Sequence, residues 1–216
     1  MYKHMKSRLV KAFTLVELLI VIGLLGAIAL IVISAINPIE QANRARDARF
    51  NADSAQMVSA IERYFAAHST FPWMDCGTSC SSWDSSDDEF AFTGVGTQPV
   101  GLCGADCDTA GLLVTSNEMK TEFLGRDFIT GPANQTTTGE MDQKIFLGKG
   151  SGSSSSVYAC FVPKAKSNRE KAIAEEKVRT LAFDTSGLIS STTACDADGA
   201  AAAGWAAGSC LICVPN

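Results

Sequence analysis

The feature that most limits how this chain can fold is an unbroken apolar segment near its N-terminus. The segment runs from Phe13 to Ile36, and Glu17 is its only ionisable side chain. At a rise of about 1.5 Å per residue, a helix of this length crosses the hydrocarbon layer of a membrane, which is about 30 Å thick. We therefore predict a membrane-spanning helix over residues 13–36.

The residues before this segment indicate which way the helix is inserted. Four basic residues and no acidic residue lie among the first twelve: Lys3, Lys6, Arg8 and Lys11. Basic flanks stay on the cytoplasmic side of a membrane, so we expect residues 1–12 to be a cytoplasmic leader and the rest to face outward. A secretory signal has a shorter apolar core followed by a small-residue cleavage site, a pattern that this sequence lacks.

The chain beyond the leader is acidic, which bears on its partners. The net charge is −5, and it becomes −9 without the first twelve residues (14 basic, 23 acidic). Nucleic-acid-binding proteins need a basic surface to contact phosphates. We therefore predict no direct nucleic-acid binding.

Eight cysteines, all after residue 70, indicate an oxidising compartment outside the cytoplasm. They are Cys76, Cys80, Cys103, Cys107, Cys160, Cys195, Cys210 and Cys213. Each C-x-x-x-C pair could close on itself or cross-link its loop to the sheet. We expect the last three cysteines to join the C-terminal segment to the strand that holds Cys160. Zinc binding by thiolates is the alternative, although structural zinc sites more often use C-x-x-C.

Two acidic segments raise the question of calcium. The first is Asp84, Asp87, Asp88 and Glu89, and the second is Asp196 and Asp198. The second does not fit a calcium-binding EF-hand loop, because Ala207 stands where the twelfth-position glutamate belongs. We interpret both as solvated loops and predict no cofactor and no metal ligands, with calcium left as the alternative.

No set of catalytic residues is visible in the sequence. The two histidines are His4, in the leader, and His68, which we place at a helix C-terminus. No nucleophile elbow, phosphate-binding loop or zinc-protease motif occurs. We predict no catalytic residues and no enzymatic activity.

The N-terminal residues resemble a known family. Lys11-Ala-Phe-Thr-Leu-Val-Glu-Leu-Leu-Ile-Val-Ile22 is similar to the prepilin signature of type IV pilins and type II secretion pseudopilins. The resemblance continues to Pro72, about a third of the chain. It implies cleavage by a prepilin peptidase between Ala12 and Phe13, followed by N-methylation of Phe13. The family usually has Gly where this chain has Ala12, which keeps the residue small.

Glu17 is the residue for which we expect an assembly role. A carboxylate within a membrane span costs about 2.5–3.5 kcal/mol on insertion scales, so it needs a partner or a function. Cleavage would create an amine on Phe13, and we predict that a neighbouring subunit pairs this amine with Glu17. A glutamate that simply reaches toward the interface is the plain alternative. Gly23 and Ala27 have a small-xxx-small spacing that favours helix packing, although membrane helices commonly contain such residues.

The following segment, residues 37–68, predicts an amphipathic continuation of this helix, with a kink or local melting at Pro38. The predicted buried face holds Phe50, Met57, Ile61 and Tyr64, with Val58 and Phe65 beside it. The residues expected to be exposed or at its edges are Arg44, Arg46, Asp47, Arg49, Asp53, Glu62 and Arg63.

Residues 69–216 are predicted to form an exported globular domain. Strands are expected at 157–162 and 178–183, with turns at 166–169 and 184–187. Residues 73–111 read as a loop-rich insertion, residues 118–123 as a short helix, and residues 148–156 as a Gly/Ser-rich loop. We predict an α+β fold, in which a small antiparallel sheet lies on the long helix and disulfides staple the loops.

These observations favour a structural subunit of a type IV pilus or related pseudopilus, held in the inner membrane and then placed in a filament outside the cell. The resemblance implies other copies of the chain, related pilins, a prepilin peptidase, a membrane platform protein and an assembly ATPase as partners. The main alternative is a membrane-anchored ligand-binding protein that does not polymerise. An anchored metal or thiol enzyme is the third hypothesis.

Overall fold

The computed structural model describes residues 13–35, 37–75, 88–104, 107–130, 138–152, 155–184, 187–190, 195, 204–205 and 210–215. The chain divides into two compact units, residues Met1–Ile39 and Glu40–Asn216. The fold is α+β, as the sequence predicts.

Helix α1 (Leu15–Ala35) forms most of the first unit. Its sequence consists of Leu, Ile, Val, Ala and Gly apart from Glu17 and Ser34, and no proline interrupts it. The apolar segment predicted to span a membrane therefore forms a regular helix over Leu15–Ala35. Pro38 is the first residue of the next helix, where a proline costs nothing because no N–H is needed there.

Helix α2 (Pro38–His68) provides one wall of the hydrophobic core of the second unit. The predicted apolar face is confirmed, because Phe50, Met57, Ile61 and Tyr64 are all buried. Phe50 contacts the rings of Phe128 and Phe161 edge to face. Burial of each such side chain contributes about 1.5–3 kcal/mol, so this face holds α2 on the rest of the unit.

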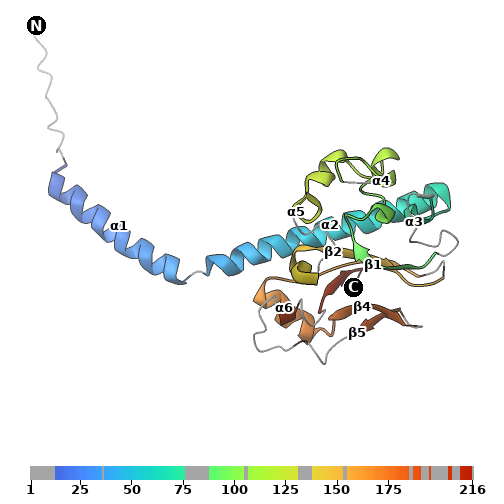
Figure 1. Cartoon of the computed structure of the whole chain (residues 1–216). Helices are drawn as coiled ribbons and strands as arrows, with labels where there is room; N and C mark the ends of the chain where they lie inside the picture. The colour runs from blue at the N-terminus through green and yellow to red at the C-terminus, as the bar shows by residue number, and fades with distance from the viewer. Residues whose placement is uncertain are drawn as a thin grey trace, which may run out of the picture. The chain divides into compact units, whose positions relative to one another are not determined.

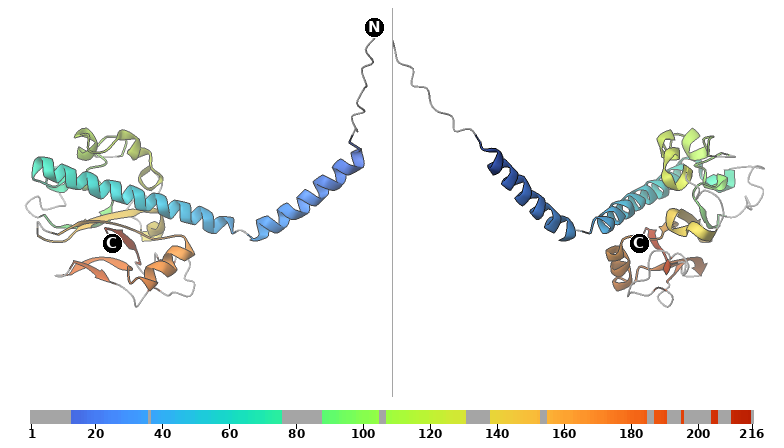
Figure 2. Two further views of the ribbon diagram at one scale, coloured as in Figure 1. Left: turned by 180° about the vertical axis from the view of Figure 1, so that it is seen from behind. Right: turned by 60° about the vertical axis from the view of Figure 1, so that its left-hand side comes forward.

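The main sheet is antiparallel and has the strand order β1-β2-β3-β6. Its strands are β1 (Phe90–Gly94), β2 (Ile145–Lys149), β3 (Val157–Phe161) and β6 (Ile212–Val214). Side chains alternate between the two faces: Ala159 and Phe161 belong to the core shared with α2, whereas Tyr158 and Cys160 belong to a second core on the other side. Figures 1 and 2 show α2 running along the first face.

The second face of the sheet is covered by helix α6 (Lys166–Ala174) and the hairpin of β4 (Arg179–Asp184) and β5 (Gly187–Ser190) (Figure 1). Trp205, Val162, Val178 and Leu211 are buried in the core between these layers. A disulfide between Cys160 and Cys213 joins the paired strands β3 and β6 at this level.

Short helical segments complete the described part of the second unit. They are α3 (Pro72–Asp75), η2 (Gln98–Val100), α4 (Leu112–Thr115), η3 (Thr121–Gly125), α5 (Asp127–Thr130) and η5 (Thr138–Gln143). At the C-terminal end of α2, the rings of Phe65, Phe71, Trp73 and Phe90 stack in succession with centroids 4.4–4.6 Å apart. This aromatic row ties the end of α2 to strand β1.

Several local predictions need correction. The predicted turn at residues 166–169 is the start of helix α6, and the two predicted strands lie in different sheets, β3 in the main sheet and β4 in the hairpin. The predicted loop-rich segment 73–111 contains strand β1. Strand β2, at residues 145–149, also overlaps the start of the predicted Gly/Ser-rich loop.

Asp47, predicted to be exposed or at an edge, is instead 2% exposed. Its carboxylate accepts hydrogen bonds from the backbone N–H groups of Lys164 and Ala165 and from the Asn168 side chain, each at 2.9 Å. Arg46 donates a fourth bond at 3.1 Å. The N-cap residue Ala165 has no side chain that can cap α6, so Asp47 of α2 caps it from another element.

Asp53, also 2% exposed, is another exception to the predicted exposure. Arg126 lies 3.3 Å from its Oδ1 atom, and no donor within the described residues reaches its Oδ2 atom. Burial raises the pKa of Asp53, and the nearby Arg126 only partly opposes this effect. Two carboxylates on one helix are thus buried with very different numbers of partners.

This contrast predicts opposite outcomes for the same substitution. Asp47→Asn should lower the free energy of unfolding by about 3 kcal/mol, since an amide cannot accept all four bonds. Asp53→Asn should change it by less than about 1 kcal/mol or raise it at neutral pH, because the ionised form of Asp53 is disfavoured in the folded state. That gain should vanish as the pH falls below the ordinary value of 3.8. Urea unfolding of the full chain in micelles, followed by tryptophan fluorescence, measures both; equal losses would contradict the assignment.

Candidate functional site

The most distinctive surface of the described chain is α1. Every side chain from Phe13 to Ile33 is exposed. Residues Leu15–Ile33 have a mean hydropathy of 3.0 and none of them is buried. Apolar side chains cover all sides of this helix, so no single face could dock onto a core. The helix is long and apolar enough to span a membrane.

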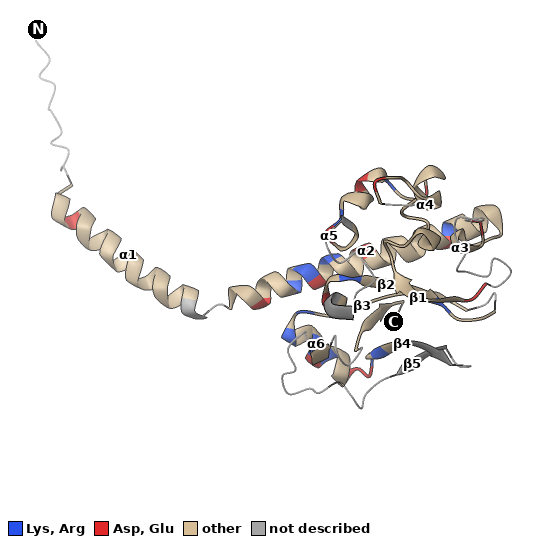
Figure 3. Ribbon diagram, in the orientation of Figure 1, with Lys and Arg blue, Asp and Glu red and all other residues tan. Residues whose placement is uncertain are grey.

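Glu17 is the one charged residue of α1 and lies in its first turn (Figure 3). Its Oε2 atom accepts hydrogen bonds from the Thr14 backbone N–H at 3.0 Å and from the Thr14 hydroxyl at 2.8 Å. In return, the Glu17 N–H donates to Thr14 Oγ1 at 3.2 Å. This reciprocal pair is a capping box, which satisfies backbone donors that a helix leaves free at its N-terminus.

The capping box engages only one of the two carboxylate oxygens of Glu17. Both bonds from Thr14 end on Oε2, so Oε1 carries none of them. Phe13, the predicted processing residue, precedes the helix and is 78% exposed, whereas Ala12 lies outside the described residues. The Glu17 carboxylate is therefore held in the first turn of α1, close in sequence to Phe13. The predicted cleavage between Ala12 and Phe13 would give Phe13 a free amine.

The small residues of α1 lie open on the helix surface. A Cβ added to Gly23 or Gly26 would have no heavy atom within 4 Å outside its own helical turns. Ala27, one turn after Gly23, is likewise exposed. No described residue packs against Gly23 or Gly26, so this small-xxx-small spacing remains available for another helix.

Glu40, at the start of α2, forms a second polar site. It accepts hydrogen bonds from the backbone N–H groups of Lys166 and Ser167 at 3.0 and 3.1 Å, and from the Ser167 hydroxyl at 2.9 Å. The bond from the Ser167 backbone is the main reason that the pKa of Glu40 falls to about 2. Glu40 and Asp47 together therefore hold the N-terminal turn of α6 against α2.

The cysteine prediction is confirmed for six of the eight residues. Disulfides join Cys103 to Cys107, Cys160 to Cys213, and Cys195 to Cys210. One C-x-x-x-C pair thus closes on itself, and the C-terminal segment is stapled to the strand that holds Cys160. Cys76 and Cys80 lie outside the described residues.

Of the acidic residues considered as possible calcium ligands, the structure describes only Asp88 and Glu89. Asp84, Asp87, Asp196 and Asp198 lie outside the described residues. Asp88 pairs instead with Lys149, whose ammonium is 3.3 Å away and fully buried. Among the residues that can be placed, no three His, Cys, Asp or Glu side chains gather as metal ligands.

His68 ends helix α2, where the sequence placed it. Its ring stacks on Tyr64 with centroids 4.1 Å apart, and its Nδ1 lies 3.0 Å from the Tyr64 carbonyl oxygen. Burial, together with a hydrogen bond to Asp75, raises the pKa of Tyr64 to about 12. These contacts belong to the packing at the end of the helix.

Sequence reasoning missed two elements of these sites. The Thr14-x-x-Glu17 spacing is a capping-box signature and could have been found in the sequence. The role of Glu40 could not, because its partners at residues 166 and 167 lie more than a hundred positions away along the chain. No protein family, curated protein or solved structure matches this chain.

Removal of the capping hydroxyl tests the Thr14–Glu17 box. Thr14→Val should speed hydrogen exchange at the Glu17 amide by about fivefold, because a lost N-cap costs about 1 kcal/mol. Thr14→Ser keeps a hydroxyl and should leave this exchange nearly unchanged. Exchange measured by mass spectrometry on the full chain in micelles distinguishes them, and equal effects of the two variants would refute the box.

The Glu40 site predicts a defined pH dependence. Glu40→Gln should lower the free energy of unfolding at pH 7 by about 1 kcal/mol, as for a lost helix cap. Because the folded-state pKa is depressed from 4.5 to about 2, this contribution is complete above pH 4.5 and is lost as the pH falls toward 2. Urea midpoints at several pH values measure the difference. Glu62→Gln, an exposed position on the same helix, is the control and should show no such difference.

Proposed function

We propose that this chain is a structural subunit of a type IV pilus or a related pseudopilus. One observation carries the proposal: a helix of 21 residues exposes apolar side chains on all sides and holds a single carboxylate in its first turn. Such a surface needs lipid or other apolar helices around it. A membrane anchor that later packs in a filament core meets this need at both stages.

The carboxylate is what favours assembly over simple anchoring. The capping box gives Glu17 a local role in any anchor, but a charge within a membrane span still carries a cost that pairing with an amine would offset. If a peptidase removes residues 1–12, Phe13 gains an amine in the same layer as Glu17. A neighbour's amine then pairs with the Glu17 carboxylate only at one axial offset of the two helices. The pair would therefore set the register of the filament.

Several consequences for location and partners follow from the proposal. The precursor is a single-pass protein of the cytoplasmic membrane with its leader inside, and the second unit faces outward. Its partners are other copies of the chain, related subunits, a prepilin peptidase, a platform protein and an assembly ATPase. The three disulfides agree with an oxidising compartment for the second unit.

Mass spectrometry of the N-terminus tests processing and export together. We expect protein sheared from the surface of the producing cells to begin with N-methylated Phe13. Protein found only in membranes, still beginning at Met1, would reject the filament and favour the anchored ligand-binding module.

Substitution of Glu17 tests the register pair in the same cells. Glu17→Gln keeps an oxygen that can accept the Thr14 bonds but removes the charge, so sheared filaments should fall at least about tenfold while the membrane-bound protein persists. Glu62→Gln on α2 is the matched control and should shear normally. Normal filaments from Glu17→Gln would exclude the proposed pairing with the amine.

A further inference from the structure

An ion pair joins α2 to the segment formed by η3 and α5, and its two partners differ in their access to water. Asp53 of α2 and Arg126, at the junction of η3 and α5, lie 3.3 Å apart; the Asp53 side chain is 3% exposed and that of Arg126 is 41% exposed. No donor within the described residues reaches the second carboxylate oxygen of Asp53, Oδ2. A buried carboxylate therefore depends on a cation that can also turn toward solvent.

Three charged groups face Asp53. Arg126 and Asp127 belong to the η3–α5 segment, and Arg49 lies one helical turn before Asp53 on α2. Burial is the largest influence on the pKa of Asp53 and raises it; Arg126 and Arg49 oppose this effect, whereas Asp127 adds to it. Asp127 also holds Arg49 at 2.8 Å, which leaves Arg126 as the main cation beside Asp53. Asp53 therefore takes up a proton at a higher pH than the ordinary value of 3.8.

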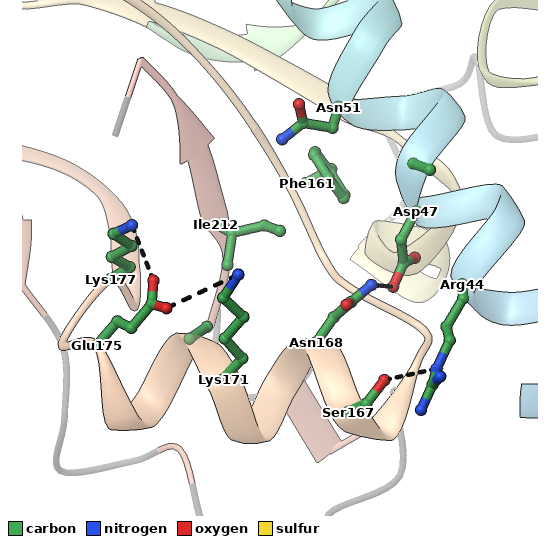
Figure 4. A pocket seen from close by; sticks show the side chains of 12 residues that line it. Arg44, Asp47, Asn51, Phe161, Ser167, Asn168, Lys171, Glu175, Lys177 and Ile212 are labelled. Carbon is green, nitrogen blue, oxygen red and sulfur yellow. Dashed lines mark hydrogen bonds and ion pairs between the residues drawn. The ribbon is translucent and has the colours of Figure 1, made fainter.

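The attachment of α2 to α6 responds to acid in the opposite way (Figure 4 shows α2 and α6 side by side). Glu40 accepts hydrogen bonds from the backbone N–H groups of Lys166 and Ser167 at the start of α6, and the Ser167 bond chiefly lowers its pKa to about 2. Between the raised pKa of Asp53 and the depressed pKa of Glu40, Asp53 is neutral while Glu40 keeps its charge. Acid in this range can therefore weaken one attachment of α2 and leave the other intact.

The surroundings of Arg126 allow the pair to open. Arg126 lines a groove of about 630 Å³ between α2 and residues 118–126, so its guanidinium has room to move. The segment itself stays in place, because Phe123, Phe128 and Ile129 are buried in the core shared with α2. Loss of the ion pair would then loosen the backbone around Arg126 without detaching the segment.

We propose that the Asp53–Arg126 pair is an acid-sensitive latch between α2 and residues 121–130. Protonation of Asp53 removes the charge that strengthens its bond to Arg126, and a neutral carboxyl group is the form that burial favours. The guanidinium keeps its own charge and turns toward water in the groove. The latch opens while Glu40 still holds α6, so acid releases only one of these two attachments. This device belongs to the second unit and does not depend on the proposed assembly of α1.

Hydrogen exchange of the full chain in micelles, measured by mass spectrometry with fragmentation to single amides, tests the latch. The Ile129 amide is the probe, because it donates to the Arg126 carbonyl oxygen at 2.8 Å. Its protection factor, which corrects for the intrinsic effect of pH on exchange, should fall at least about threefold between pH 7 and pH 3.5, because a charge-assisted bond becomes a neutral one. The Ser167 amide, held by Glu40, should keep its protection over this range.

Two variants separate the latch from other effects of acid. Asp53→Asn removes the charge at every pH, so Ile129 should be weakly protected already at pH 7 and should not respond to acid. Glu122→Gln removes an exposed carboxylate of the same segment and should keep the response of the unaltered chain. Constant protection of Ile129 in the unaltered chain, or equal protection in Asp53→Asn and the unaltered chain at pH 7, would overturn the proposal. Loss of protection at Ser167 together with Ile129 would also overturn it, because that result indicates general acid unfolding.

Discussion

The constraint on which everything else depends is that the described part of the chain buries none of the apolar side chains from Leu15 to Ile33. The side chains from Leu15 to Ile33 lie open on every side, whereas the large apolar side chains described in the second unit, such as Phe50, Met57 and Ile61, are buried. Hydrophobic surface of this extent is unfavourable in water. The second unit is thus complete in itself, and the first requires an environment from outside. A membrane suits a helix without a polar face, and so does a bundle of other apolar helices such as the one proposed above.

Helix α2 shows how polar residues act in the packing of the second unit. Its apolar face forms one wall of the core, but the attachment of α6 depends on two carboxylates, Glu40 and Asp47, which accept hydrogen bonds from the backbone of residues 164–167. These acceptors replace the cap that Ala165 cannot provide. Asp53 is buried just as deeply with fewer partners, and its pKa is raised as a result. Burial alone therefore does not indicate whether a carboxylate stabilises this domain; the number of donors around it does.

The parts of the fold that short-range patterns encode could be predicted. The apolar run gives α1, the periodicity of Phe50, Met57, Ile61 and Tyr64 gives the buried face of α2, and the β-branched and aromatic run at 157–162 gives β3. The parts that failed depend on contacts distant in sequence. Residues 166–169 contain turn-forming Ser and Asn, yet they begin a helix because Glu40 and Asp47 satisfy its free N–H groups. Asp47 and Asp53 look like surface residues by type. The burial of Asp47 is explained by donors that lie more than a hundred positions away in the sequence, and that of Asp53 by the packing of α2 with only Arg126 as a partner. Strand β1 (Phe-Ala-Phe-Thr-Gly) is a short edge strand that directly follows an acidic run, and five residues are too few for its alternation to stand out in the sequence.

The capping box also changes how Glu17 should be understood. A glutamate in the first turn of a helix stabilises that helix whether or not any neighbour exists. Its presence is therefore explained in part by α1 itself, and the proposed intermolecular pairing uses the oxygen that the box leaves free. Because Thr14 engages only Oε2, the carboxylate is held with Oε1 available to a second donor. Capping and pairing are then compatible: the first fixes the position of the carboxylate, and the second uses its remaining acceptor. A carboxylate held in this way loses less conformational freedom on pairing, which favours its use as a register point between helices.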